Sequence, residues 1–280
     1  MKKIRPEFQE DVSETLLIPL CMRAKESQKK NPIIKDKISE KILSQLDYDF
    51  NKFAADERCQ LCISIRTNYF DNALKEFVSK YDDAVVVVVA CGLDPRIERV
   101  AIDKKFQTYQ IDFPDVIKFR RKLLPESAEN KYISGNITNN EWVKVIKENH
   151  PMGHFLFLVE GLSMYLNEAQ VKQFFKTVDE NFSNAEIHIE RVNKHLSRRT
   201  QSVISVNQTK AVFNWGCDDP LEIERWGNSF KFKGEYYYYS VPKLTELRER
   251  IGNDAILYQT DPEYNRSIGI WKYEKNPQPK

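Results

Sequence analysis

The chain lacks several features that assign proteins to broad classes. No stretch approaches the ~20 consecutive apolar residues that cross a bilayer, and no apolar segment follows the basic start of a secretory signal. Its five cysteines are odd in number and scattered, as is typical of reduced thiols in the cytoplasm. The 43 basic and 41 acidic residues nearly cancel, which argues against nucleic acid or a membrane surface as a partner. We therefore expect a cytoplasmic protein that binds neither.

Residues for metal binding and nucleophilic catalysis are also scarce. Cys59 and Cys62 form a Cys-x-x-Cys, but no second pair at zinc spacing accompanies them. They are better interpreted as small buried residues on one side of a helix, and no metal site is expected. Of the four histidines, only His195 has a position that suits a general base, and a surface location is the alternative.

The most informative segment is a buried strand that ends at a glycine. Residues 84–96 read Ala-Val-Val-Val-Val-Val-Ala-Cys-Gly-Leu-Asp-Pro-Arg. On an amphipathic strand, five consecutive valines would point alternately into water, so this run predicts a strand buried on both faces of a parallel sheet. Nucleotide-like ligands bind at the carboxyl ends of such strands in open α/β sheets. The turn at Gly92 therefore predicts a cofactor cradle.

Strands and helices alternate after this segment. Further strands are predicted at residues 108–113, 131–136, 154–159 and 186–192. Helices are predicted between them at residues 114–124, at 139–147 and after Asn167, which suits an N-cap. This alternation implies right-handed crossovers and an α/β fold with a doubly wound, mostly parallel sheet.

The two ends of the chain depart from the alternation. The N-terminal residues carry apolar side chains at helical spacing, whereas residues 256–259 and 268–273 predict an antiparallel C-terminal hairpin. The segment before this hairpin is too apolar to be disordered and is expected to cover the active edge of the sheet. We expect one domain, divided into a helical cap at 1–80, a cofactor-binding core at 84–192, a substrate-cap insertion at 193–240 and a closing part of the sheet at 241–273.

Polar residues follow four successive strands of the predicted sheet. These are Gly92, Asp94, Asp112, Asn136 and Glu160. An acid about 20 residues beyond the glycine turn suits the two hydroxyls of a ribose, and an amide after the next strand suits an adenine edge. Taken singly, Asp112 would serve equally well as a helix cap, and Asn136 would more simply be a turn residue. Their joint register along successive strands favours an adenosine site.

Phosphate-binding motifs are missing from the same region. Ala90-Cys91-Gly92 lacks the complete Gly-x-Gly-x-x-Gly of a dinucleotide site, and no Gly-Lys-Ser or Gly-Lys-Thr is present for a nucleoside triphosphate. An adenosine ligand without a polyphosphate fits these absences better. A nicotinamide-dependent oxidoreductase on a related sheet is therefore disfavoured.

Several motifs resemble those of one protein family. The three main motifs are Gly-Leu-Asp-Pro-Arg at 92–96, Gln-Ile-Asp-Phe-Pro at 110–114 and Val-Glu-Gly-Leu-Ser-Met-Tyr-Leu at 159–166. Supporting segments lie at 14–19, 66–71, 142, 214–220 and 226–227. Together they resemble the leucine carboxyl methyltransferase family, whose bacterial members include O-methyltransferases of polyketide and other small-molecule pathways. The resemblance extends over about residues 11 to 273 and implies the seven-stranded sheet of class I methyltransferases, with S-adenosylmethionine as cofactor.

The resemblance also implies roles for individual residues. Arg66 matches the arginine that holds the methionine carboxylate of the cofactor, and a guanidinium fork suits that bidentate pairing. The other matches are Gly92 in the turn beneath the cofactor, Asp112 as the ribose-binding acid, Asn136 with Ile137 as the adenine-contacting pair, and Glu160 as a partner near the methionine end.

Two positions of the cofactor site depart from the family pattern. Ala90 stands where the family usually has glycine, and its methyl group occupies space where the backbone passes close to the ligand. Asn136 stands where the family usually has aspartate, although an amide oxygen still accepts from the adenine amine. These departures motivate an alternative hypothesis, a catalytically inactive methyltransferase fold that binds a ligand or a partner.

The implied reaction transfers a methyl group from a sulfonium to an oxygen of a small-molecule acceptor. Because the cofactor supplies the activated group, the protein must mainly align the reacting atoms and exclude water. A carboxylate acceptor needs no general base, so the scarcity of suitable histidines slightly favours it over a hydroxyl. Tyr165 and Arg191 are candidates to position the acceptor, with packing and surface pairing as their respective alternatives. No catalytic residue is assigned.

Overall fold

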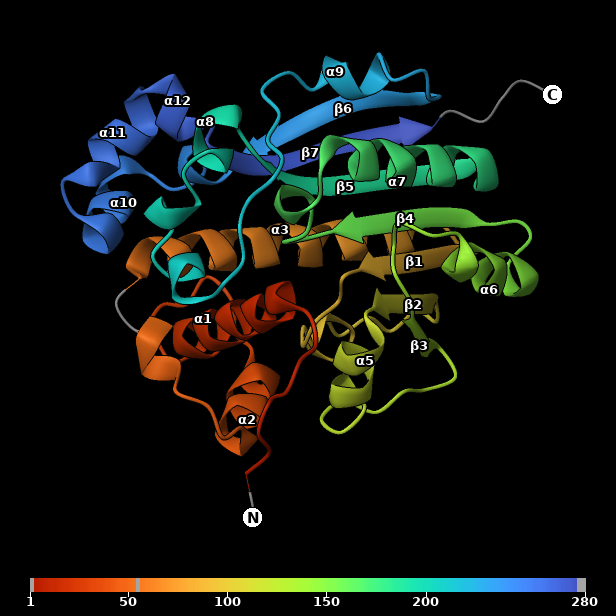
Figure 1. Cartoon of the computed structure of the whole chain (residues 1–280), viewed down its shortest axis with the longest axis horizontal. Coiled ribbons are helices and arrows are strands. Elements are labelled where there is room, and N and C mark those ends of the chain that lie inside the picture. The colour runs from red at the N-terminus through yellow and green to blue at the C-terminus, as the bar shows by residue number, and fades with distance from the viewer. Residues whose placement is uncertain (1–2, 54–55, 276–280) are drawn as a thin grey trace.

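A computed structural model, which describes residues 3–53 and 56–275, shows the chain folded around one seven-stranded sheet (Figure 1). The strand order is β3-β2-β1-β4-β5-β7-β6. The first five strands are parallel, and β7 runs antiparallel to its neighbours β5 and β6. The strands are β1 (Ala84–Val89), β2 (Gln107–Asp112), β3 (Asn130–Ser134), β4 (His154–Val159), β5 (Asn184–Val192), β6 (Phe230–Tyr237) and β7 (Ile268–Lys275).

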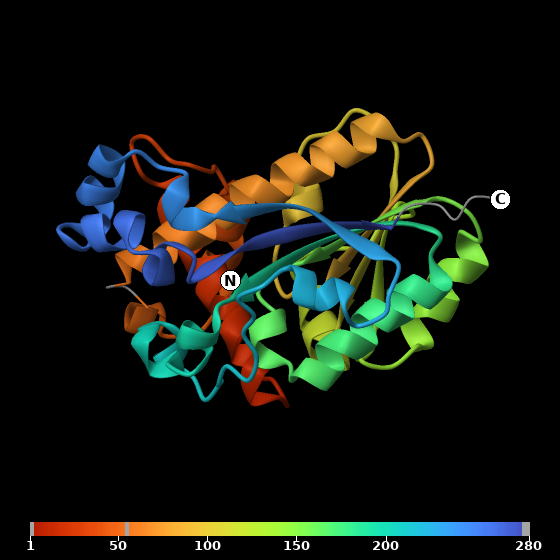
Figure 2. The same cartoon turned by 90° about the horizontal axis from the view of Figure 1, so that it is seen from above.

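Helices cover both faces of this sheet, as the view from above shows (Figure 2). Those before the sheet are η1 (Asp11–Leu16), α1 (Leu17–Ser27), α2 (Lys37–Gln45), η2 (Phe50–Phe53) and α3 (Glu57–Lys80). Those between β1 and β5 are α4 (Arg96–Arg99), α5 (Pro114–Arg120), α6 (Glu141–Asn149), η3 (Ser163–Tyr165) and α7 (Glu168–Asn181). The remaining ones are α8 (Lys194–Ser197), η4 (Thr200–Ser202), η5 (Val206–Gln208), α9 (Leu221–Glu224), η6 (Tyr238–Ser240), α10 (Leu244–Ile251), α11 (Asp254–Thr260) and α12 (Pro262–Asn265).

The valine run explains why both faces must be covered. Successive side chains of a strand point to opposite faces. Val85, Val87 and Val89 pack in the apolar cluster that contains residues of α6 and α7, whereas Val86 and Val88 pack in the cluster that contains residues of α3. All of these valines are buried. The prediction of a central strand buried on both sides, and of the class I methyltransferase sheet around it, is therefore confirmed.

The C-terminal hairpin differs from the prediction. Residues 256–259 lie in helix α11 and not in a strand, and the antiparallel partner of β7 is β6. A run of four apolar residues does not distinguish a strand from a helix by periodicity. In the structure Ala255 and Tyr258, three residues apart, pack together in the core, while the two residues between them are exposed.

Strand β6 lies within the segment that we predicted as a substrate cap. Its charged residues are exposed and alternate with less exposed ones, and a β-bulge between Phe232 and Gly234 interrupts the pairing with β7. Phe230 and Phe232 pack in the cluster that contains α7, whereas Tyr236 packs in the cluster that contains α3. The alternation of charged and aromatic residues is a strand signal. Residues 193–229 of the predicted insertion therefore form the connection between β5 and β6.

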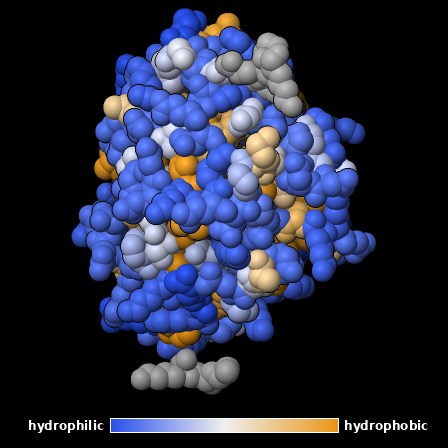
Figure 3. Space-filling view, turned by 90° about the vertical axis from the view of Figure 1, so that its right-hand side faces the viewer, coloured by the Kyte–Doolittle hydropathy of each residue, from blue (hydrophilic) through white to orange (hydrophobic). Residues whose placement is uncertain are grey.

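The N-terminal helices and this insertion meet beyond the carboxyl ends of the parallel strands, on the left in Figure 1. A third apolar cluster joins Leu17 and Leu20 of α1 to Met164 of η3 and to Val206 and Phe213 of the insertion. The opposite face of the molecule is largely hydrophilic, with its apolar side chains in small separate patches (Figure 3). In the part of the chain that the structure describes, every helix is too short or too polar to cross a membrane.

Candidate active site

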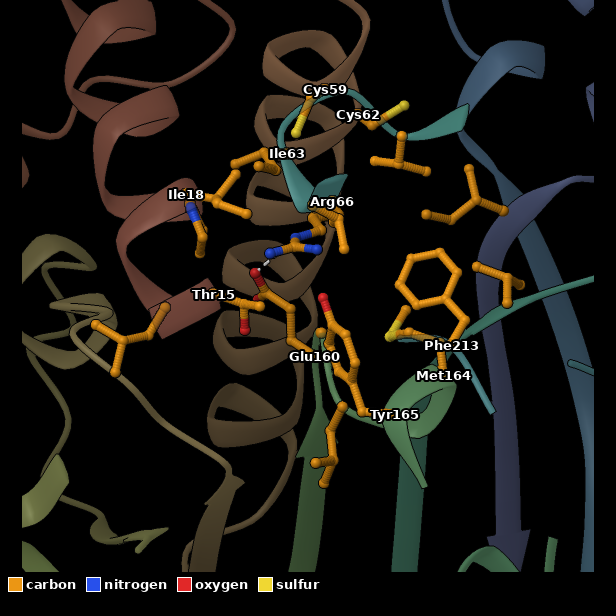
Figure 4. A pocket seen from close by; sticks show the side chains of 18 of the residues that line it. Thr15, Ile18, Cys59, Cys62, Ile63, Arg66, Glu160, Met164, Tyr165 and Phe213 are labelled. Atoms are coloured by element: carbon orange, nitrogen blue, oxygen red, sulfur yellow. Dashed lines mark hydrogen bonds and ion pairs between the residues drawn. The ribbon is translucent and has the colours of Figure 1, made fainter. Parts of the chain in front are cut away.

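A cavity of about 400 Å³ lies at the carboxyl edge of the sheet. Its lining comes from η1, α1 and α3, from the turns after β1, β2, β4 and β5, from the insertion, and from η6, α11 and α12. Figure 4 shows Arg66 and Glu160 near its centre, with Ile18 and Thr15 on one side and Met164 and Phe213 on the other. The carboxyl edge of the sheet therefore faces a cavity, and the N-terminal helices and the insertion, which we predicted to cover this edge, enclose that cavity.

The turn after β1 is tight and strained. Gly92 has φ +49°, and a Cβ at this position would stand 3.1 Å from the Cβ of Leu16. Ala90 has φ +53° and is the one non-glycine residue with positive φ in the described chain. Such a conformation is favourable for glycine and costs an L-residue about 1–2 kcal/mol. The methyl group expected to crowd the ligand therefore also strains the backbone.

Buried Arg120 of α5 holds this turn from below. Its Nη1 donates to the carbonyl oxygen of Gly92 at 3.0 Å, and its Nη2 donates to that of Asp94 at 2.8 Å. A guanidinium has a fixed planar arrangement of donors, so two bonds to one turn define its shape. Sequence reasoning missed this residue because its partners are carbonyl groups, which no side-chain motif reveals.

Asp112 ends β2 with both carboxylate oxygens in use. Oδ2 accepts from the amide of Gly92 at 2.7 Å, and Oδ1 accepts from the amide of Phe113 at 2.8 Å. The N-cap of α5 is Phe113, so Asp112 is not the helix cap that the sequence left open. Burial raises the pKa of Asp112 to about 6. The carboxylate lines the cavity and retains lone pairs for further donors.

Arg66 lies in α3 between two carboxylates of neighbouring strands. Its Nε donates to Glu160 Oε1 at 2.9 Å, and its Nη1 donates to both oxygens of Glu190 at 3.2 and 3.1 Å. Its Nη2 makes no hydrogen bond within the described chain and lies next to the glycine turn after β4, where a Cβ on Gly161 would stand 3.5 Å from it. The Nη2 group of the guanidinium thus remains available to donate hydrogen bonds to an anionic ligand.

Glu190 is a member of this site that the sequence reasoning missed. It is fully buried in β5 and also accepts from the Gly161 amide at 2.6 Å and from the Tyr238 hydroxyl at 2.8 Å. The sequence does contain a signal for it, namely an acidic residue within a strand whose neighbours are buried. Charged residues are almost never fully buried unless they are paired. Its partner Arg66 is 124 residues away in the chain, so the pair emerges only from the fold.

A network of buried ion pairs continues from Glu160 toward the N-terminal helices. Arg96 contacts Glu160 at 2.5 Å, Asp94 at 2.9 Å and Asp71 at 2.9 Å. Burial opposes ionisation of Asp94, but the guanidinium groups around it outweigh this effect and hold its pKa well below the usual range. The Glu160 side chain is 9% exposed, and Arg96 and Arg66 likewise outweigh the effect of its partial burial and lower its pKa. These carboxylates remain charged at neutral pH and fix the floor of the cavity.

The wall beyond Arg66 is apolar and aromatic. Tyr165 packs edge-to-face on Phe213 with the ring centroids 5.4 Å apart, and Met164 lies beside them (Figure 4). Burial raises the pKa of Tyr165, so its hydroxyl stays neutral. Cys59 and Cys62 are free thiols on α3 and also line the cavity. Burial raises the pKa of both thiols, which makes them unreactive packing residues.

Three predicted site residues lie outside the cavity lining. Asn136 is exposed beyond the end of β3, where its Oδ1 accepts from the amide and hydroxyl of Thr138 at 2.9 and 2.8 Å. Ile137 packs in the core of the sheet. Arg191 is only 1% exposed, donates to the carbonyl of Arg266 at 2.7 Å and stacks on Trp271. The surface location considered for Arg191 is therefore wrong, because its position in β5 points into the protein.

His195 does line the cavity, at the start of the insertion. Its Nδ1 lies 2.5 Å from Glu263 Oε1, and both side chains retain partial solvent exposure. In this arrangement the carboxylate orients the imidazole. The structure thus places the one histidine considered as a base on the predicted face of the sheet.

The fold and this site define a protein class. A seven-stranded sheet in the order β3-β2-β1-β4-β5-β7-β6, with β7 antiparallel and a cavity at the carboxyl edge of the parallel strands, is the arrangement of a class I methyltransferase. The model of the leucine carboxyl methyltransferase family matches residues 17–179, more than half of the chain. The chain belongs to the leucine carboxyl methyltransferase family.

Individual relatives agree with this assignment. The chain is 28% identical over 237 residues to the tetracenomycin polyketide synthesis O-methyltransferase TcmP of Streptomyces glaucescens, covering 85% of this chain and 87% of that protein. It is 26% identical over 246 residues to the S-adenosyl-L-methionine-dependent methyltransferase dpfgK of Gibberella zeae, covering 79% and 80%. The crystal structure of a DUF574 family protein from Streptomyces avermitilis superposes with a TM-score of 0.58 at 8% identity, over 91% of this chain and 96% of that one, and shows the fold alone.

Proposed function

We propose that the protein is an S-adenosylmethionine-dependent O-methyltransferase that acts on a carboxylate or hydroxyl of a small molecule. The observation that carries this proposal is the presence of two complementary groups on one cavity. Asp112 offers a carboxylate to a ribose, and Arg66 offers its unpaired Nη2 to the carboxylate of an amino acid. S-adenosylmethionine contains both groups, and when bound it supplies the activated methyl.

Other residues complete the proposed cofactor site. The turn at Ala90 and Gly92 lies beneath the cofactor, and Glu160 lies at its methionine end beside Arg66. The amide of Gly135 donates to the carbonyl of Asp112 at 2.9 Å, which sets the loop that carries Asn136 beside the ribose site. We propose that Asn136 and Ile137 contact the adenine there, and we leave Arg191 out of the site.

The chain contributes to the reaction mainly by orientation and by exclusion of water. Tyr165 and the apolar residues around it form the side of the cavity that we assign to the acceptor. The N-terminal helices and residues 193–229 cover the open edge of the same single domain. Relatives such as TcmP support transfer to oxygen and a small-molecule acceptor.

The test is isothermal titration calorimetry of the protein with S-adenosylmethionine and with S-adenosylhomocysteine, followed by an acceptor screen with labelled methyl donor. Micromolar binding of both compounds and transfer of label to an oxygen acceptor support the proposal. If neither compound binds, the proposal is overturned.

A second candidate function has one observation in its favour. Ala90, where the family usually has glycine, carries a methyl group in the turn that we place beneath the cofactor, where it reduces the space for close approach of the ligand. This alternative is a catalytically inactive methyltransferase fold that binds a ligand or partner. Cofactor binding without methyl transfer to any acceptor in the screen would favour it.

A further inference from the structure

The connection between β6 and β7 is longer than the sheet requires. These strands are antiparallel neighbours, and Tyr237 at the end of β6 pairs with Gly269 near the start of β7. Two such strand ends can be joined by a turn of about two residues. Instead, the chain between them forms η6, α10, α11 and α12, and the last three project from the left end of the molecule in Figure 1 and Figure 2. The pairing of the strands does not account for this excursion.

The first half of the connection is firmly anchored. Tyr238 and Tyr239 of η6 and Leu247 of α10 are buried in the apolar cluster that contains residues of α3. Arg250 of α10 forms an ion pair at 2.6 Å with Glu26 of α1, whose side chain is completely buried. Apolar burial and a buried ion pair therefore fix α10 to the N-terminal helices.

The second half, residues 252–266, has little apolar anchorage, and we call it the flap. Of these residues, all of which the structure describes, Ala255 alone is buried, while Ile256 and Leu257 are 45% and 41% exposed. The flap begins at Gly252, whose φ of +66° and ψ of −142° suit glycine and provide a point where the chain can pivot. Segments with few buried apolar contacts open locally at low cost in free energy.

The flap nevertheless forms part of the cavity wall. Tyr258 of α11 and Glu263 and Tyr264 of α12 line the cavity, and all three retain exposure to solvent. The Tyr258 ring packs on that of the anchored Tyr239, with the centroids 4.4 Å apart. Because side chains of the flap face both the cavity and the solvent, the flap separates this part of the cavity from the surrounding water.

Two side-chain contacts, which we call the latches, hold the flap against other walls of the cavity. Arg58 of α3 donates from Nη1 to the Tyr258 hydroxyl at 2.7 Å. On the other side, Nδ1 of His195 in α8 lies 2.5 Å from Oε1 of Glu263. All four side chains are partly or fully exposed, and polar contacts between such groups are weak. Both latches can therefore break without exposing apolar core.

Other hydrogen bonds hold the flap at its base. Gln259 donates to the carbonyl of Pro242 at 2.8 Å, and the Ser240 hydroxyl donates to Asn265 at 2.9 Å. Asn193 donates to the carbonyl of Glu263 at 2.8 Å. These partners lie in the segment that leads into α10 and at the end of β5, close to where the flap rejoins the sheet. They leave the side of the flap that faces the cavity held by the latches.

We propose that residues 252–266 are a gate that opens to admit a small molecule to the cavity and closes over it, with Arg58–Tyr258 and His195–Glu263 as its latches. When closed, the gate excludes water from the cavity, and α10 stays in place as it moves. The inference rests on the proposed function only for the identity of the admitted molecule, the methyl acceptor. It adds the route by which that molecule enters.

Cys62 provides a built-in reporter for the gate. Its thiol lines the cavity and donates to the hydroxyl of Tyr239, on which the Tyr258 ring of the flap rests. The protein without ligands is treated with methyl methanethiolsulfonate, and modification of each cysteine is followed by peptide mass spectrometry. Cys217, which is buried outside the cavity lining, is the internal reference.

The latch variant combines Tyr258→Phe with Glu263→Met, which removes both polar contacts and keeps side chains of similar size. We expect it to raise the labelling rate of Cys62 about tenfold or more and to leave that of Cys217 unchanged, since each lost contact shifts the equilibrium toward the open gate. Asp83→Met is the matched control. It removes a contact of the same kind, at 2.7 Å from His154 and outside the cavity lining, and should leave the labelling of Cys62 at the wild-type rate.

Hydrogen exchange of the wild-type protein provides a second, independent measurement. The amides of α11 should exchange at least about tenfold faster than those of the anchored α10. Equal exchange in the two helices, an unchanged labelling rate of Cys62 in the latch variant, or an equal acceleration at Cys217 would each overturn the inference. Neither measurement requires cofactor or acceptor. A failure of S-adenosylmethionine to bind would therefore overturn the proposed function and leave the gate in place.

Discussion

Glu190 and Arg66 form a buried ion pair beside the cavity at the carboxyl edge of the sheet. A single nitrogen of the guanidinium, Nη1, contacts both oxygens of the fully buried carboxylate. Glu190 accepts two further hydrogen bonds, from the Gly161 amide and the Tyr238 hydroxyl. It therefore connects β5, the turn after β4, helix α3 and the end of β6 through one side chain.

We expect Glu190→Gln to lower the free energy of unfolding by about 3 kcal/mol, because removal of one partner from a buried ion pair leaves an uncompensated charge. Urea denaturation at neutral pH measures this change. Glu180→Gln is the control, since Glu180 pairs with Lys176 on the exposed face of α7 and should alter stability by no more than about 0.5 kcal/mol. Equal effects of the two substitutions would show that Glu190 carries no structural charge.

We expect Arg66→Lys to weaken binding of S-adenosylhomocysteine by about 10- to 100-fold, the range for loss of a charged hydrogen bond of about 1.5–3 kcal/mol. A lysine has a single charged nitrogen, which the two buried glutamates will occupy. Binding of 5′-methylthioadenosine, which lacks the amino-acid group, should remain unchanged and serves as the control for folding. Calorimetry with both compounds distinguishes them, and a parallel loss of both would contradict the assigned role.

The affinity for S-adenosylhomocysteine should fall about tenfold between pH 7 and pH 5. The pKa of Asp112 is raised to about 6, so its ionised fraction falls by about that factor over this range. Only the ionised carboxylate accepts hydrogen bonds from the backbone amides and both ribose hydroxyls. Asp112→Asn should bind weakly at both pH values and lose the pH dependence. A wild-type affinity that is constant from pH 5 to 7 would remove Asp112 from the ribose site.

We expect Ala90→Gly to raise the free energy of unfolding by about 1 kcal/mol, because glycine adopts φ +53° without strain. Thermal melting measures the change, and cofactor affinity should be unchanged or tighter. Ala73→Gly, in the interior of α3, is the matched control and should be destabilising by about 1 kcal/mol or more. Destabilisation by both substitutions would mean that the Ala90 methyl contributes packing that outweighs its strain.

Much of the sheet could be predicted because buried β-branched runs are local signals. The predicted strands at 84, 108, 131, 154, 186 and 268 match β1–β5 and β7 to within two residues at each end. Strand β6 was missed because its alternating pattern was read together with the irregular segment before it. Helix α11 was misread because a short apolar run is ambiguous until its packing partners are known.

The candidate site was predictable where its residues follow strand ends. Gly92, Asp112 and Glu160 all line the cavity, since the carboxyl ends of parallel strands meet at one edge. Arg66 was predicted from the family resemblance alone, because the sequence around it in the helix does not identify its partners. Glu190 was not predicted as a site residue, because its charge is compensated by a residue that is distant in the chain.

Acidification changes the stability contributed by the acids around the cavity in two opposite directions. Protonation begins at Asp112, whose raised pKa of about 6 favours the neutral form, so the folded state gains stability from this group as the pH falls. Asp94 and Glu160 have lowered pKa values, and the stability that they contribute is lost only when the pH falls through those values, below the usual carboxyl range. A buffer near pH 5 should therefore weaken the binding of an adenosine ligand without unfolding the protein, and a return to neutral buffer should restore the affinity.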